Sequence, residues 1–168
     1  DHAIMNIVTS AFGNAGQKCS ACSLLLVERS VYEDENFRSK LKDAATSLKT
    51  GSVWNAGNIV GPMITNKNDK LLQAFNLEPG ESWLVPPRFI DRREYILAPT
   101  VKWGVKPESF SFRTELFGPL LSVACIENLE EGIRLVNGLD YGLTSGLQSL
   151  DEKEQKLWKN SVMAGNLY

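Results

Sequence analysis

Cys19 is the residue of this chain with the clearest potential for chemistry, because a cysteine thiolate is a strong nucleophile. It lies in the stretch SAFGNAGQKCSACS, residues 10–23, three positions after Gly16. A helical pattern precedes it and an apolar strand pattern follows, so we expect Cys19 in a turn, where its side chain can face a cleft. The neighbouring Lys18 favours a thiolate. Cys19 is therefore a candidate nucleophile, and a buried structural thiol is the alternative.

The spacing of Cys19 and Cys22 also allows a redox pair or half of a zinc site. A zinc site needs about four ligands, and the other candidates are His2, at the chain start, and Cys125, in an apolar run. A thioredoxin-type motif stands where a strand enters a helix, whereas here a helix leads into a strand. We therefore predict no metal site, and we expect Cys22 to be a core residue at the start of the strand.

A second candidate stretch is RTELFGPLLSV, residues 113–123. It contains one carboxylate, Glu115, one aromatic residue, Phe117, and a Gly-Pro turn that enters an apolar strand. A solvated Glu115 and a core Phe117 would be the ordinary interpretation. The chain contains neither of the glycine-rich phosphate-binding motifs, G-x-x-x-x-G-K-[ST] and G-x-G-x-x-G. Its only histidine is His2. The general base for a Cys19 nucleophile is therefore not evident in this sequence.

Composition and net charge argue against several classes of function. The chain has 168 residues, 43% of them hydrophobic and 23% charged, as in globular domains. Its net charge of −2 argues against electrostatic binding to nucleic acid. No apolar run approaches the roughly 20 residues that span a bilayer. Three cysteines, an odd number, do not suit a disulfide framework, so we expect a reducing, cytoplasmic location.

Hydrophobic periodicity predicts alternating helices and strands. We expect helices at roughly 2–13, 37–48, 66–76, 129–136 and 151–163, and strands at 22–27, 83–85, 95–97, 101–105, 120–126 and 144–147. This alternation indicates an α/β fold with three αβα layers around a mostly parallel sheet. We expect residues 1–168 to form one domain. The missing initial Met and the strand pattern that begins in the last residues, AGNLY, suggest a fragment of a longer chain.

Taken together, the two stretches resemble the aldehyde dehydrogenase family. Residues 12–21 are similar to its active-site signature F-x-x-x-G-Q-x-C-x-A, and residues 115–119 to its E-x-F-G-P motif. Further matches are Asn137, residues 141–144 and residues 164–166. The run from Ser10 to Ser23 is most similar to the Δ1-pyrroline-5-carboxylate dehydrogenase branch, which bacterial bifunctional PutA proteins also carry.

The resemblance implies that Cys19 is the catalytic nucleophile of an NAD-dependent oxidation of glutamate semialdehyde to glutamate, with NADP as a possible cofactor. It further implies that Glu115 binds the nicotinamide ribose, that Phe117 packs near the nicotinamide, and that Ser20 helps to hold the substrate carboxylate. The family's glutamate base, oxyanion asparagine and nucleotide-binding domain are not in this chain. We therefore expect an inactive isolated fragment and, at full length, a bacterial homo-oligomer that binds a small aldehyde.

Three other interpretations stay open at this point. The chain could be a generic aldehyde dehydrogenase domain, or a non-catalytic module that keeps the same fold for interaction. A thiol–disulfide module would need Cys19 and Cys22 to bridge. The presence of Cys19, Glu115 and Phe117 together favours the enzyme, because an interaction module has no physical need for all three.

Overall fold

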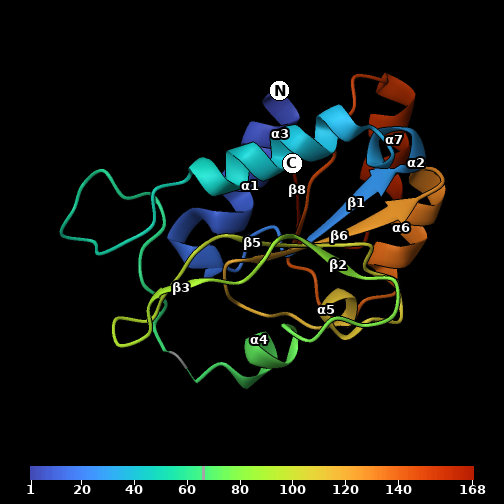
Figure 1. The fold of residues 1–168 in the computed structure, drawn as a ribbon. Helices are drawn as coiled ribbons and strands as arrows, with labels where there is room; N and C mark the ends of the chain where they lie inside the picture. Colours follow the sequence, from blue (N-terminus) through green and yellow to red (C-terminus); the bar gives the residue numbers. More distant parts are fainter. Residues whose placement is uncertain (66) are drawn as a thin grey trace.

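A four-stranded sheet forms the centre of the computed structural model, which describes residues 1–65 and 67–168. Its strand order is β1-β6-β5-β2, and the bounds are β1 (Leu24–Glu28), β6 (Leu120–Ile126), β5 (Thr100–Trp103) and β2 (Ser82–Val85). Strand β6 pairs in parallel with both β1 and β5, whereas β2 is antiparallel to β5. The predicted, mostly parallel α/β sheet is thus confirmed (Figure 1).

Helices cover both faces of this sheet. The main core lies between the sheet and the helices α1 (His2–Phe12) and α3 (Glu35–Ser47). A smaller core on the other face joins α5 (Phe110–Arg113) and α6 (Leu129–Asn137) to the sheet, and α7 (Glu152–Ser161) packs against α6. Strand β6 is apolar except for Ser122, as expected for a strand covered on both faces, and the buried Ser122 hydroxyl donates to the Ser111 carbonyl at 3.2 Å.

Short elements complete the chain. The 3-10 turn η1 (Gly13–Gly16) follows α1, α2 (Arg29–Tyr32) follows β1, and α4 (Asp69–Gln73) precedes β2. Strands β3 (Phe89–Asp91) and β4 (Ile96–Leu97) form a hairpin outside the main sheet. Strands β7 (Thr144–Ser145) and β8 (Asn166–Leu167) form a separate parallel pair.

Several predicted boundaries were wrong. The first strand begins at Leu24, so Cys22 precedes the strand and does not open it. The helix expected at 66–76 is reduced to α4, and its expected first residue, Asn66, lies outside the described residues. Strand β5 ends at Trp103 because Gly104 turns the chain with a positive φ of 81°. Helices α2 and α5 and strand β3 were not predicted.

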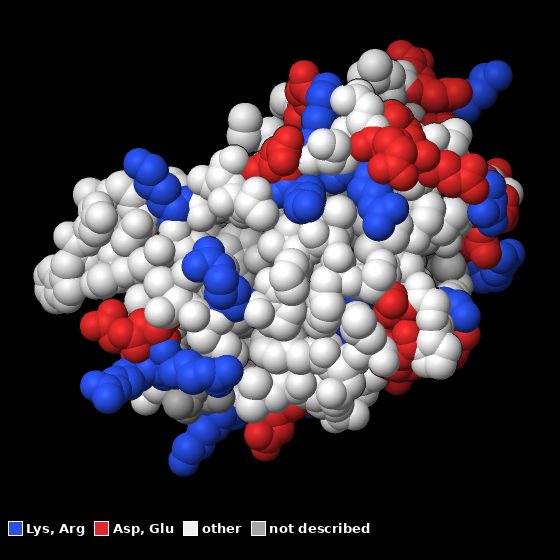
Figure 2. Space-filling model, in the orientation of Figure 1, with Lys and Arg blue, Asp and Glu red and all other residues white. Residues whose placement is uncertain are grey.

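Charged side chains are unevenly distributed over the surface (Figure 2). One group lies along the upper side, over α3 and α7, where acidic and basic groups alternate, and another lies at the lower left, near β3. The loop formed by residues 51–60 extends at the left as a lobe without charged residues, and its Trp54 is 94% exposed. Among the described residues, no helix is both long and apolar enough to cross a membrane.

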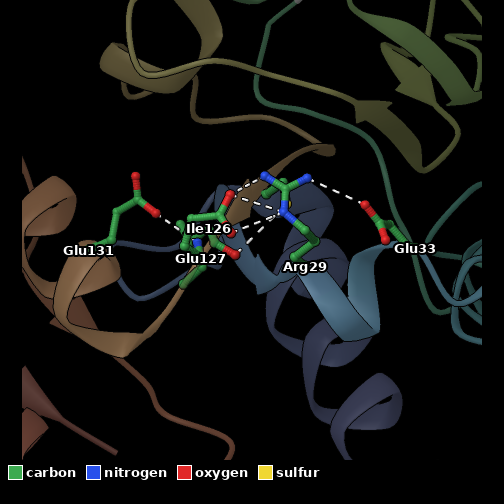
Figure 3. Close-up of polar contacts among 6 residues, drawn as sticks. Arg29, Glu33, Ile126, Glu127 and Glu131 are labelled. Atoms are coloured by element: carbon green, nitrogen blue, oxygen red, sulfur yellow. Dashed lines mark hydrogen bonds and ion pairs between the residues drawn. The ribbon is translucent and has the colours of Figure 1, made fainter.

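An ion cluster joins the carboxyl ends of β1 and β6 (Figure 3). The Arg29 guanidinium donates hydrogen bonds to both carboxylate oxygens of Glu127, with Nε 3.0 Å from each, and contacts Glu33 at 3.4 Å. Glu131 accepts a bond from the Glu127 backbone N–H at 2.7 Å. The cluster connects the two strands at their carboxyl ends, whereas the two candidate motifs precede the amino ends of the same strands.

Candidate active site

The two candidate stretches meet because they lead into neighbouring parallel strands. Cys19 precedes β1 and Glu115 precedes β6, and these strands pair in register with Leu24 opposite Ser122. Loops that enter adjacent parallel strands arrive at the same edge of a sheet. The topology therefore places both loops at the amino ends of β1 and β6.

Cys19 lies in a tight turn that is fastened to the end of α1. The Ala21 N–H donates to the Lys18 carbonyl at 3.0 Å, which closes the turn. The Cys22 N–H donates to the Ser10 hydroxyl at 3.2 Å, and that hydroxyl donates to the Ser20 carbonyl at 3.5 Å. Ser20 is half-buried, while Cys19 is an exposed, free thiol. The turn thus presents the Cys19 sulfur to an approaching ligand.

The segment before this turn has an unusual backbone. Asn14, Ala15 and Gly16 all have positive φ values, of 53°, 55° and 67°, a region that glycine adopts freely and asparagine occasionally, whereas alanine is strained there. A Cβ atom at Gly16 would lie 2.2 Å from the Gly118 carbonyl oxygen. Only a glycine at position 16 lets the backbone of the Cys19 loop touch the backbone of the Glu115–Phe117 loop.

Side-chain amides add hydrogen bonds between the loops. Gln17 donates from Nε2 to the Phe117 carbonyl at 3.4 Å and accepts from the Ile64 N–H at 2.9 Å. Asn68 donates from Nδ2 to the Leu116 carbonyl at 2.7 Å and to the Phe117 carbonyl at 3.3 Å. The Phe117 carbonyl is therefore the point where the segments around residues 17, 68 and 117 converge.

Glu115 and Phe117 both face solvent. Phe117 has a φ of 51° and its side chain is 41% exposed, so it is not the core residue of the ordinary interpretation. Glu115 is exposed and lies near Tyr141, whose hydroxyl donates to the Phe112 carbonyl at 3.2 Å. Burial raises the pKa of Tyr141, and the Glu115 carboxylate raises it further. The loop thus offers one aromatic face and one carboxylate beside the Cys19 turn.

The other two thiols have surroundings that suppress ionisation. Cys22 packs against the main core, and desolvation raises the pKa of its thiol from 9.0 to about 11. Burial also raises the pKa of Cys125, although Arg29 lowers it in part. Since thiolates are the reactive form, neither side chain is suited to act as a nucleophile at neutral pH. All three cysteines are free, so Cys19 and Cys22 are not bridged.

The structure brings together the loops that carry all four predicted site residues. Cys19 and Ser20 share the turn before β1, and Glu115 and Phe117 share the loop before β6. The sequence interpretation missed Asn68, which donates hydrogen bonds to the second loop and whose only local signal is that of a helix N-cap before Asp69. In the described part of the chain, no group of three or more His, Cys, Asp and Glu side chains could hold a metal ion.

Comparisons with known proteins agree with this geometry. The model of the aldehyde dehydrogenase family matches residues 1–168. A 1-pyrroline-5-carboxylate dehydrogenase of Staphylococcus haemolyticus is 33% identical over the whole chain, which covers 32% of that relative. A malonate-semialdehyde dehydrogenase of Listeria innocua is 29% identical over 98% of the chain, which covers 34% of it. The chain thus spans about a third of the length of these relatives.

Solved structures are similar as well. Proline utilization A (PutA) of Corynebacterium freiburgense superposes with a TM-score of 0.92 at 38% identity, covering 99% of this chain and 17% of that one. A Thermus 1-pyrroline-5-carboxylate dehydrogenase with bound NAD gives 0.88 at 28% identity, covering 99% and 32%. The sheet order, the two joined loops and these matches lead to one conclusion: the chain belongs to the aldehyde dehydrogenase family.

Proposed function

We propose that the protein to which this chain belongs oxidises glutamate semialdehyde, the open form of pyrroline-5-carboxylate, to glutamate with NAD or NADP. The observation that carries the proposal is the exposed Cys19 thiol in a turn joined to the Glu115–Phe117 loop. The relatives named for pyrroline-5-carboxylate dehydrogenase and PutA support this substrate, at 33% and 38% identity. The three free thiols suit a reducing cytoplasm, and we propose a homo-oligomer at full length.

The reaction begins at the Cys19 sulfur. The thiolate attacks the aldehyde carbon and forms a carbon–sulfur bond, and the carbonyl oxygen becomes an oxyanion in a thiohemiacetal. The Cys19 backbone N–H donates to this oxyanion, as preorganised donors do in acyl transfer. Loss of a hydride from the same carbon leaves a thioester, which water hydrolyses to the carboxylate product and the free thiol.

The residues of the second loop suit a nicotinamide cofactor. An exposed aromatic ring at Phe117 offers a flat apolar surface, and the Glu115 carboxylate can accept hydrogen bonds from ribose hydroxyls. The cofactor, when bound, supplies the hydride acceptor. The contacts from Gln17 and Asn68 fix the Phe117 backbone, so the ring and the carboxylate would be held in place before the cofactor arrives.

Ser20 provides a test of the substrate. If its hydroxyl binds the substrate carboxylate, Ser20→Ala in the full-length protein removes a hydrogen bond to a charged group, worth about 1.5–3 kcal/mol. The KM for glutamate semialdehyde should then rise roughly tenfold or more, while the KM for an unbranched aliphatic aldehyde changes little. Equal effects on both aldehydes would contradict the proposed role and favour a general aldehyde dehydrogenase.

Malonate semialdehyde is the second candidate substrate, because relatives with that activity in their names match 98% of the chain. It also carries a carboxylate, on a shorter carbon chain. Steady-state kcat/KM values for both semialdehydes with the full-length protein separate the two. A higher value for malonate semialdehyde would overturn the proposed substrate while leaving the role of Cys19 intact.

A further inference from the structure

Asn68 makes hydrogen bonds in two directions at once. Its Oδ1 accepts from the Leu71 N–H at 3.0 Å and so caps the N-terminus of α4. Its Nδ2 donates to the carbonyls of Leu116 and Phe117, at 2.7 and 3.3 Å. One side chain therefore links a helix end to the loop that carries Glu115 and Phe117.

Buried Leu116 and the backbone contact between Gly16 and Gly118 anchor the two sides of this loop, and side-chain hydrogen bonds from Asn68 and Gln17 hold the exposed Phe117 between them. Phe117 has a left-handed backbone, φ 51°, which a residue with a side chain rarely adopts. Its ring is 41% exposed, so burial does not anchor it fully. The Gln17 contact with the Phe117 carbonyl is 3.4 Å long, whereas the Asn68 contact with Leu116 is 2.7 Å. At the Phe117 carbonyl the Asn68 contact, 3.3 Å, is about as long as that of Gln17, but only Asn68 also bonds to the adjacent Leu116 carbonyl.

We propose that Asn68 is a positioning residue for the cofactor, and that it acts through the carbonyls of Leu116 and Phe117. By holding this backbone in its strained conformation, it keeps the Phe117 ring and the Glu115 carboxylate directed at the nicotinamide end of NAD(P). This inference rests on the proposed function of the loop. Asn68 itself need not touch the cofactor.

The alternative is that Asn68 merely caps α4, and the chemistry of substitution separates the two roles. Aspartate caps helices about as well as asparagine, so Asn68→Asp keeps the bond to Leu71. The same change removes both N–H donors and places a carboxylate against two carbonyl oxygens. Serine also keeps a capping oxygen, but it lacks the amide donors. If Asn68 only caps α4, both variants should behave like the parent protein. If Asn68 holds the Glu115–Phe117 loop, both variants should bind NAD more weakly, and Asn68→Asp should have the larger effect.

Asn128 offers a matched control in the same chain. Its side chain caps α6 by accepting from the Glu131 N–H at 2.9 Å, three residues along, as Asn68 does for α4. It follows β6, whereas the loop of Phe117 precedes β6, so the two caps lie about 20 Å apart along the strand. Asn128→Asp and Asn128→Ser therefore report the effect of the same substitutions on a cap that does not contact the Glu115–Phe117 loop.

The experiment measures the KM for NAD of the four variants in the full-length protein, with hydrogen exchange of residues 114–121 as a second readout. Asn68→Ser should raise the KM for NAD about five- to tenfold, the factor that corresponds to roughly one hydrogen bond. Asn68→Asp should raise it more, and the KM for the aldehyde should change by less than about twofold, because the substitutions act on the cofactor loop. Exchange in 114–121 should accelerate in the Asn68 variants alone.

The possible outcomes are distinct. If the Asn68 variants match the Asn128 variants in both readouts, Asn68 is only a cap and the inference is overturned. If exchange accelerates but the KM for NAD is unchanged, the loop is held by Asn68 without serving the cofactor, which also overturns it. If the unmodified full-length protein does not reduce NAD with any semialdehyde, the proposed function is wrong. Separately, unchanged hydrogen exchange of residues 114–121 in the Asn68 variants would show that Asn68 does not hold the loop.

Discussion

Cys19 differs from the other two cysteines in its surroundings, and this difference can be measured by alkylation. At pH 8, limited iodoacetamide treatment followed by peptide mass spectrometry should label Cys19 first, because its thiol is exposed. Cys22 should resist until the pH approaches its raised pKa of about 11. Cys125, whose pKa is also raised by burial, should react slowly. Earlier labelling of Cys125 than of Cys19 would contradict this assignment.

The left-handed backbone at Ala15 leads to a second prediction at the residue scale. Ala15 is fully buried with a φ of 55°, and glycine there would remove strain of about 1–2 kcal/mol while losing a similar amount to chain entropy. Ala15→Gly should therefore change the free energy of unfolding by less than about 1 kcal/mol. Ala15→Val adds β-branching in a strained, filled site and should cost roughly 2–4 kcal/mol.

Urea unfolding of the two Ala15 variants beside the parent chain gives both values. The glycine variant serves as the control, since it shares the position but has no side chain. If valine and glycine gave equal midpoints, the left-handed conformation before Cys19 would not be the native one.

At the element scale, β5 is joined to the turn before β2 by a buried ion pair. The Lys102 ammonium lies 3.0 Å from a carboxylate oxygen of Glu81, and both side chains are fully buried. Lys102 also donates to the Asn76 carbonyl at 2.9 Å, and Glu81 accepts from the Glu78 N–H at 2.8 Å. Within the described residues, the second oxygen of Glu81 has no hydrogen-bond partner. The pair is thus sensitive to the loss of either member.

Lys102→Met should destabilise the domain by about 3–5 kcal/mol, because it leaves a buried carboxylate without its counter-ion. Adding Glu81→Gln removes that charge and keeps an oxygen for the Glu78 N–H, so the double variant should recover at least about 1 kcal/mol. Chemical denaturation of the parent, the single variant and the double variant measures this coupling. Additive or worsening effects would show that the carboxylate is not dependent on Lys102.

The elements also show which parts of the fold can be predicted from sequence. Strand β6 has the predicted bounds, because a run of apolar residues covered on both faces is a strong local signal. Of the hairpin formed by β3 and β4, only β4 was predicted. The pairing of the two strands is irregular, and no short turn motif connects them in the sequence. The burial of Lys102 could not be predicted, since it depends on an ion pair with Glu81, which directly precedes the neighbouring strand β2.

Some features of the candidate site can likewise be predicted from the sequence, and others cannot. The turn position and exposure of Cys19 follow from local pattern, as a helix, glycines and an apolar strand flank it. The contact between Gly16 and Gly118 and the convergence of Gln17 and Asn68 on Phe117 depend on which strands are neighbours. Strand order is a tertiary property, so these contacts become visible only in the folded molecule.

At the scale of the whole molecule, the chain corresponds to about a third of its curated relatives. We expect the isolated 168-residue chain to fold cooperatively, because it has a buried core on each face of its sheet. One charge-assisted contact from Glu115 contributes about 1.5–3 kcal/mol, well below the roughly 8 kcal/mol of micromolar binding. Calorimetry should therefore detect no micromolar NAD binding to this chain alone, and no NADH should form with pyrroline-5-carboxylate. Micromolar binding or steady turnover by the isolated chain would contradict this expectation.

We propose that Cys19 forms the covalent intermediate, and trapping that intermediate gives the sharpest test of its role. The full-length protein is mixed with NAD and pyrroline-5-carboxylate, quenched in acid within one turnover, digested and examined by mass spectrometry. We expect a glutamyl thioester on the peptide that contains Cys19, and none on that peptide when Cys19→Ser is treated identically. Acylation of Cys22 or Cys125 instead, or undiminished NADH production by Cys19→Ser, would contradict it.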